Sequence, residues 1–74
     1  MEKPIVMLPV TSSNINEIGY DKDTLTLRIV FKTGGVYEYY KVPADVFKQF
    51  YYDESIGRYF RTFIKGIYQF ERIR

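Results

Sequence analysis

The fold is decided by residues 24–40, whose sequence is TLTLRIVFKTGGVYEYY. Apolar side chains alternate with mainly polar ones through its first half: Leu25, Leu27, Ile29 and Phe31 share one face, while Thr26, Arg28, Val30 and Lys32 share the other. Strict alternation with β-branched residues is typical of a strand buried on one side. Two glycines then turn the chain, so we expect residues 36–41 to return as the second strand of a hairpin.

The length of the hairpin loop decides which way the tyrosines of the returning strand face, because a one-residue slip moves every side chain to the other face. A loop made of the two glycines alone would turn Tyr37 and Tyr39 away from the apolar face. A three-residue loop with one glycine in the left-handed conformation would place them on it. The longer loop also brings Glu38 beside Arg28, where opposite charges can pair. We therefore predict the three-residue loop, with Tyr37 and Tyr39 mainly in the core.

The segments around this hairpin complete the sheet and add two helices. Residues 15–20 are a short extended run, joined to the hairpin by the polar turn of residues 21–24. Pro43 ends the hairpin and suits the first turn of a helix over residues 44–52, which has apolar side chains at helical spacing. A second helix begins after Ser55, a good N-cap, and should end at Gly66. Its predicted apolar stripe comprises Ile56, Phe60, Phe63 and Ile64.

Alternation returns in residues 67–74, which predicts a last strand. The sequence thus predicts an α+β fold, a small antiparallel sheet in the order β-β-β-α-α-β covered by a helical pair. Residues 1–9 contain two prolines and no periodic pattern, so we expect an N-terminal arm that is mobile. Residues 10–74 are expected to form one domain, because a chain of 74 residues leaves no room for a second core.

The composition excludes several classes of enzyme. The chain has no Cys, His or Trp, which removes thiolate nucleophiles, zinc–thiolate sites and serine–histidine catalysis. Asp21 and Asp23 begin like a calcium loop, but Leu25 takes the next ligand position and no glycine follows for the bend. Asp53 and Glu54 are neighbours at a helix start, where they suit the helix dipole. We expect no catalytic set, no cofactor and no metal ion.

Positive charge gathers in the second half of the chain. Up to Tyr40 there are four Lys or Arg and five Asp or Glu, whereas from Lys41 on there are seven and four. In the second helix, Arg58, Arg61 and Lys65 follow one another at i, i+3 and i+7. Such a stripe beside tyrosines is what phosphate contacts and base stacking need, although the solvated face of an amphipathic helix has the same pattern.

Several short motifs in this order resemble the KTSC domain family, named after the C-terminal extension of some lysyl-tRNA synthetases. They cover about residues 10–70 and comprise Val10–Ile15, Ile18–Asp21, Leu25–Phe31, Gly34 or Gly35, Tyr37-Glu38-Tyr39, Val42-Pro43, Ser55–Phe60, Ile64 and Tyr68. The resemblance implies a domain that occurs as a synthetase appendage or as a free-standing bacterial or viral protein. It also implies RNA binding, a suggestion that follows from the synthetase association.

Residues and resemblance together lead to two hypotheses. The first is a non-enzymatic module that binds RNA, either tRNA-like or single-stranded. Its expected phosphate contacts are Arg58, Arg61, Lys65, Arg72 and Arg74, and its expected stacking residues are Tyr59, Tyr37 and Tyr39. The alternative is a protein-interaction or assembly domain that uses exposed aromatic residues or a sheet edge. We expect a cytoplasmic protein without a membrane partner, since no signal peptide or spanning helix is visible, and a monomer or weak dimer.

Overall fold

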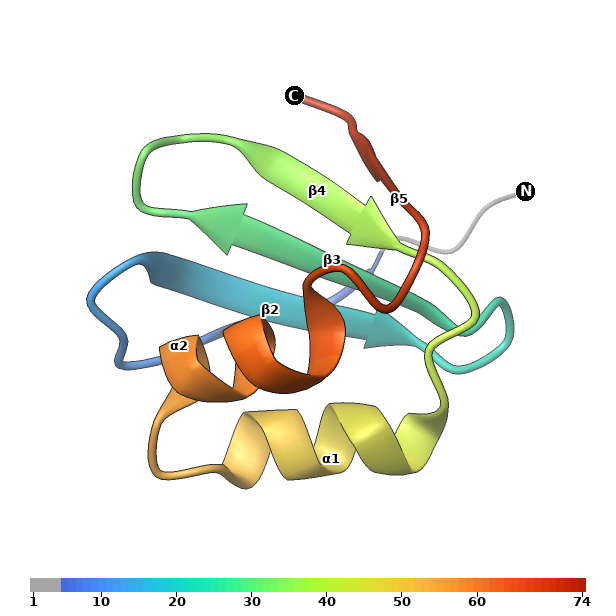
Figure 1. The fold of residues 1–74 in the computed structure, drawn as a ribbon. Helices are drawn as coiled ribbons and strands as arrows, with labels where there is room; N and C mark the ends of the chain where they lie inside the picture. The colour runs from blue at the N-terminus through green and yellow to red at the C-terminus, as the bar shows by residue number, and fades with distance from the viewer. Residues whose placement is uncertain (1–4) are drawn as a thin grey trace.

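Within residues 5–74, which the computed structural model describes, five strands form one antiparallel sheet (Figure 1). They are β1 (Met7–Pro9), β2 (Ile15–Asp21), β3 (Thr26–Phe31), β4 (Val36–Tyr39) and β5 (Phe70–Arg72). The spatial order β1-β2-β3-β4-β5 is also the chain order. Between β4 and β5 the chain forms the helices α1 (Ala44–Tyr52) and α2 (Ile56–Tyr59) and the π-helical turn η1 (Phe60–Ile64). The α+β fold predicted from the sequence is confirmed.

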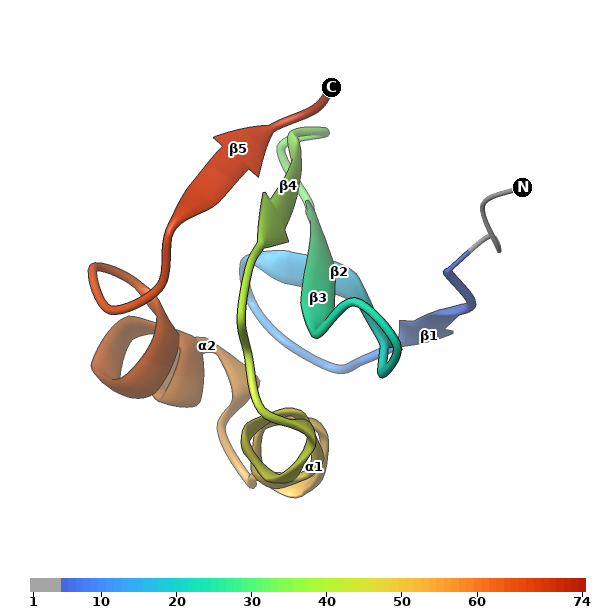
Figure 2. The same cartoon turned by 90° about the vertical axis from the view of Figure 1, so that its right-hand side faces the viewer.

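The molecule has two layers, because both helices cover the same face of the sheet and leave the other face open (Figure 2). We call the covered face the inner face and the open one the outer face. The core lies between the layers and consists of Ile15, Ile18, Leu27, Ile29, Tyr39, Val42, Phe50, Ile56, Tyr59, Phe60 and Ile64. Large rings fill much of this volume, which is an efficient solution for a domain of so few residues.

The central hairpin has the predicted register. Tyr39 pairs with Leu27 and Tyr37 with Ile29, so both tyrosines lie on the inner face. The backbone N–H of Phe31 donates to the carbonyl oxygen of Gly35 at 2.9 Å, which leaves three residues in the loop. The last of these is Gly34, whose φ of +100° is the left-handed conformation that the prediction requires.

Helix α1 packs against the sheet through contacts with β2. The ring of Tyr20 stacks on Phe47 with centroids 4.9 Å apart, and its hydroxyl donates to the carbonyl oxygen of Val42. One turn further along, Phe50 is fully buried and stacks on Tyr59 at 5.6 Å. These contacts bring α1 and α2 together under the sheet, so the two helices pack as a pair.

The second helix begins as predicted and then changes its geometry. The hydroxyl of Ser55 accepts a hydrogen bond from the N–H of Arg58 at 3.4 Å, which confirms its role as the N-cap. From Phe60 on, the turn widens, since the N–H of Lys65 donates to the carbonyl oxygen of Phe60 at 2.8 Å. This i→i+5 bond defines a π-helix and interrupts the single α-helical stripe that the sequence predicts. Gly66, with a φ of +79°, ends the helix as expected.

The N-terminal region contains a strand that the sequence did not predict. Residues 7–9 pair with β2, with Met7 opposite Gly19 and Pro9 opposite Glu17. A β-carbon on Gly19 would lie 2.6 Å from the sulfur of Met7, so this glycine allows β1 to pass close over β2. The expected arm is therefore partly an edge strand, and its residues 1–4 lie outside the described residues.

Three predicted strands are shorter than expected, and the returning strand of the hairpin ends at Tyr39 and not at Lys41. The expected hairpin strand starts at Thr24, but Leu25 adopts a φ of +55° in the preceding turn and is 41% exposed, so the inner-face alternation begins only at Leu27. The last strand starts at Phe70 and not at Ile67, because residues 65–67 make a turn after η1. A helix that could cross a bilayer is absent from residues 5–74.

Candidate functional site

A groove of about 600 Å³ opens between η1 and the β3–β5 part of the sheet. Five of its lining residues are aromatic: Phe31, Tyr37, Tyr39, Phe60 and Phe70. The others are Asn14, Thr33, Arg61, Lys65 and Gly66. We call this feature the aromatic groove. Its volume lies in the range of pockets that bind drug-sized ligands, and its lining, mainly apolar with a few polar groups, is typical of such pockets.

The aromatic wall is built by pairing between β4 and β5. Register places Phe70 opposite Tyr39 and Arg72 opposite Tyr37, all on the inner face. The rings of Tyr39 and Phe70 stack with centroids 5.4 Å apart, and Phe60 of η1 meets Tyr39 edge-on at 5.6 Å. Phe70 nevertheless stays 53% exposed, so a large part of its ring is open to solvent beside the groove.

The hydroxyl of Tyr39 is a polar group on an otherwise apolar wall. Only 4% of this residue is exposed, and its hydroxyl makes no hydrogen bond to another of the residues 5–74. Since no buried polar side-chain atom of residues 5–74 lacks a partner, the hydroxyl oxygen must reach solvent, and the groove that Tyr39 lines is the opening available to it. Burial, with a smaller contribution from Tyr37, raises the pKa of Tyr39 to about 12. The group is therefore a neutral hydroxyl at physiological pH.

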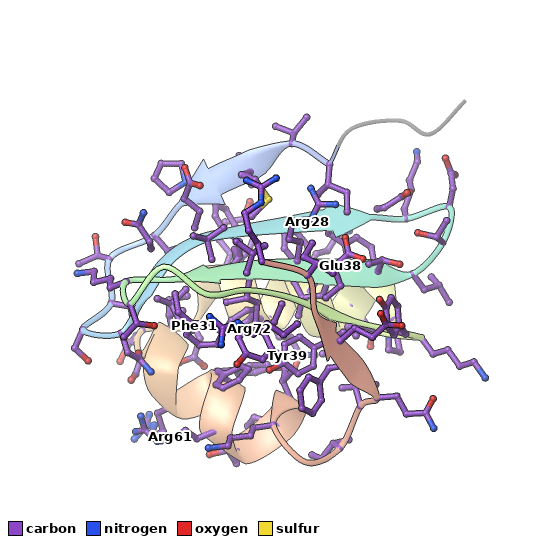
Figure 3. The ribbon with its side chains drawn as sticks, turned by 90° about the horizontal axis from the view of Figure 1, so that it is seen from above. Arg28, Phe31, Glu38, Tyr39, Arg61 and Arg72 are labelled. Carbon is purple, nitrogen blue, oxygen red and sulfur yellow. The ribbon has the colours of Figure 1, made fainter. Side chains whose placement is uncertain are left out.

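Three cations surround the aromatic groove. Arg61 and Lys65 line it from the helical layer. Opposite them, on β5, the guanidinium of Arg72 lies 5.9 Å from the ring centroid of Tyr37, and its Nε donates to the carbonyl oxygen of Arg74 at 3.1 Å. Figure 3 shows Arg61 projecting from the helix. None of the three makes an ion pair within residues 5–74, so their charge is available to an external anion.

The other predicted site residues lie elsewhere or are covered. Arg58 and Arg74 are exposed but do not line the groove. Tyr59 was predicted to stack on bases, and this is wrong, because only 7% of it is exposed. Its ring lies between Phe50 at 5.6 Å and Phe63 at 4.7 Å, which leaves no face for a ligand. The helical spacing in the sequence indicates this burial of Tyr59. Tyr59 follows Ile56 by three residues, so it lies next to the apolar stripe of the helix.

Sequence reasoning missed three aromatic residues of the site, Phe31, Phe60 and Phe70. Phe31 and Phe70 were assigned only to strands and Phe60 only to the apolar stripe of the second helix, where an apolar side chain is normally part of the core. The position of Phe70 beside Tyr39 depends on a strand pairing between residues 31 positions apart in the chain. No local pattern encodes such a pairing, so the sequence could not show that β5 completes a groove.

Nothing in residues 5–74 suggests a metal site, as no group of three or more Asp or Glu side chains is close enough to hold an ion. Asp21 and Asp23, which resemble the start of a calcium loop, form a turn in which the carboxylate of Asp21 accepts from the N–H of Asp23 at 2.9 Å. An Asx turn of this kind closes a hairpin and needs no ion.

Comparison with known proteins places these features in a family. The model of the KTSC domain matches residues 11–68. A crystal structure of a KTSC domain protein from Yersinia pestis superimposes with a TM-score of 0.93 at 38% identity, covering 96% of this chain and 100% of that one. A protein of Tsukamurella paurometabola is 41% identical over 59 residues, which are 80% of this chain and 88% of that protein.

Larger relatives carry the same segment within an enzyme. A lysine–tRNA ligase of Nostoc punctiforme is 40% identical over 67 residues, or 90% of this chain. The similar ligase of Trichormus variabilis also matches at 40% over 67 residues. The chain spans only 12% of the length of these ligases. The matched family is that of a small domain, and the same segment is found within a ligase.

Proposed function

Because the chain belongs to the KTSC domain family, we propose that it is a non-enzymatic module that binds RNA through the aromatic groove. The observation that carries this proposal is the combination of exposed aromatic surface with three cations that have no ion-pair partner among residues 5–74, Arg61, Lys65 and Arg72. Proteins that bind single-stranded nucleic acid combine cations for the phosphates with rings for the bases. The ligase relatives add support, because their name, lysine–tRNA ligase, describes an enzyme that acts on tRNA.

Each side of the groove has a different task in this proposal. Arg61 and Lys65 contact phosphates from the helical side, and Arg72 contacts the backbone from the sheet. Phosphate contacts release counterions, so affinity should fall as salt rises, with a logarithmic slope of about 0.7 for each phosphate contacted on a single strand. Three contacts therefore predict a slope of about two. We also propose that the protein is located in the cytoplasm, because an RNA partner would be found there.

The test is a titration of labelled RNA at several salt concentrations. The probes are mixed tRNA and a single-stranded oligonucleotide of mixed sequence, followed by fluorescence anisotropy. We expect the double variant Arg61→Glu/Lys65→Glu to lose at least ten-fold in affinity. Lys22→Glu/Lys48→Glu is the matched control, since it also reverses two exposed charges, and neither residue lines the groove.

Two results would overturn the proposal. One is no binding of either RNA at low salt. The other is equal affinity of the double variant and Lys22→Glu/Lys48→Glu, which have the same net charge, because binding would then follow net charge and not this groove.

A protein-interaction module is the second candidate, and exposed apolar residues favour it. Phe63, Ile67 and Phe70 are 52%, 60% and 53% exposed, and Ile67 and Phe70 border a common shallow hollow. Exposed apolar surface of this kind often marks a protein contact. Light scattering separates the candidates, because self-assembly would give a mass that rises with concentration, while an RNA-binding monomer keeps a constant mass.

A further inference from the structure

We infer that the aromatic groove takes one unpaired nucleobase, which stacks on the open face of Phe70. This inference rests on the proposed RNA-binding function and names its ligand, an unstacked base in a single strand, loop or end. A base inside a duplex has both faces covered and would have to leave the stack to enter.

The ring of Phe70 offers the stacking surface. One side of it is occupied by Tyr39 at a centroid distance of 5.4 Å and an interplanar angle of 29°, while 53% of the residue stays exposed. Tyr37 approaches the same ring at 5.8 Å with a tilt of 39°, so Phe70 is held in place by two neighbours. A fixed ring with an open face loses little freedom when a base stacks on it.

The cations fit the phosphates on either side of such a base. Arg61 and Lys65 stand on the wall across from Phe70, and Arg72 lies on the same strand as Phe70, two residues further on. A base in the groove would thus have positive charge on both sides. A volume of about 600 Å³ suits one nucleotide, while a duplex with its two backbones would stay outside.

The experiment compares three probes of equal length and label: a single-stranded RNA, the same strand with abasic residues in place of all nucleotides, and the strand paired in a duplex. All three carry phosphates, but only the first offers accessible bases. We expect the single strand to bind about ten-fold more tightly than the abasic probe, within the 5- to 150-fold range for stacking one base, and more tightly than the duplex.

Variants assign the effect to residues. Phe70→Ala should weaken binding of the single strand about ten-fold and leave the abasic probe unchanged. Tyr52→Ala is the control, because this ring is 79% exposed at the end of α1 and lies outside the groove. Thermal unfolding of each variant confirms that it is folded.

The outcomes separate the inference from the proposed function. If the abasic probe binds as tightly as the single strand, the nucleobase site is wrong while RNA binding stands. If Phe70→Ala weakens both probes equally, the ring only supports the fold, and the inference is also wrong. If no probe binds, the proposed function fails, and the inference fails with it.

Discussion

The two faces of the sheet use their arginines in opposite ways. On the outer face Arg28 binds Glu38 across the β3–β4 pair, with Nη2 2.6 Å from Oε2 and the side chains only 30% and 16% exposed (Figure 3). Beside the aromatic groove, Arg61 and Arg72 have no Asp or Glu side chain as a partner among residues 5–74. The comparison teaches that clustered charge in a sequence says little until pairing is known. An arginine paired with a carboxylate across two strands stabilises the sheet, whereas an arginine without such a partner next to aromatic rings can bind a ligand.

A similar contrast separates two phenylalanines. Phe50 of α1 is fully buried in the core, while Phe70 of β5 is half exposed beside the groove. Both stack on a tyrosine at a similar distance, 5.6 Å for Phe50 and 5.4 Å for Phe70. Exposure and not ring contact therefore distinguishes a residue of the core from a residue of the candidate site.

We expect the largest loss of stability when Phe50, whose ring is buried, is replaced. Phe50→Ala should lower the free energy of unfolding by about 3–5 kcal/mol, because it leaves a cavity between α1 and α2. A domain of this size has a total stability of about 4–11 kcal/mol, so the variant should be largely unfolded in moderate urea. Phe70→Ala should cost only about 1–2 kcal/mol, since half of the ring is already exposed. Urea unfolding followed by circular dichroism measures both, and equal losses would contradict the distinction.

The next effect concerns the edge of the sheet farthest from the groove. In Gly19→Ala the new β-carbon would lie 2.7 Å from the backbone oxygen of Val6, so β1 would have to shift. We expect a loss of about 1–3 kcal/mol and faster amide exchange in β1, with β3 and β4 unchanged. RNA binding should be retained, because no residue of β1 lines the groove. Unchanged exchange in β1 would show that the contact relaxes without moving the strand.

A pH-dependent effect should follow from Tyr39. Its pKa is raised to about 12 by burial, with a smaller contribution from Tyr37, against 10.0 in its unperturbed state. The folded state therefore holds this proton more tightly, and the stability it contributes is complete below pH 10 and is lost as pH rises toward 12. Tyr39→Phe should reduce the fall of the melting temperature across that window. Some fall will remain, since burial also raises the pKa of Tyr20 and Tyr59.

The smallest effect belongs to the ion pair on the outer face. Arg28→Met should lower stability by about 1 kcal/mol or less, because a partly exposed pair gains little over its hydration. Its RNA affinity should match that of the unmodified protein, which sharpens the contrast with Arg61. A ten-fold loss of RNA affinity in Arg28→Met would place the binding surface on the outer face instead.

Local sequence rules were sufficient for the hairpin and the helix ends. Alternation, one left-handed glycine and the Arg28–Glu38 pairing together specified the register of β3 and β4, and Ser55 and Gly66 bounded the second helix. Each of these signals acts over a few residues, so a single sequence can reveal it.

The features that build the candidate site depend on contacts between distant segments. The second helix widens into a π-turn at Phe60–Ile64, and no residue type in it specifies a widened turn. β1 has three residues, one of them proline, and is a strand only because β2 offers an edge. The cations of the helical layer and of β5 lie near the same groove because both segments pack next to β4. A periodic pattern in the sequence does not predict which distant segments pack together.

The number of residues between Lys65 and Phe70 determines which side chains of β5 face the groove. Strand pairing opposes Phe70 to Tyr39 and Arg72 to Tyr37, while Glu71 faces the outer side. Deleting one residue of this connection, with the partners on β4 fixed, would bring Glu71 and Ile73 to the inner face in their place. An acidic wall would then stand where a basic aromatic one was, so a change in length alone can invert the polarity of the ligand that this scaffold accepts.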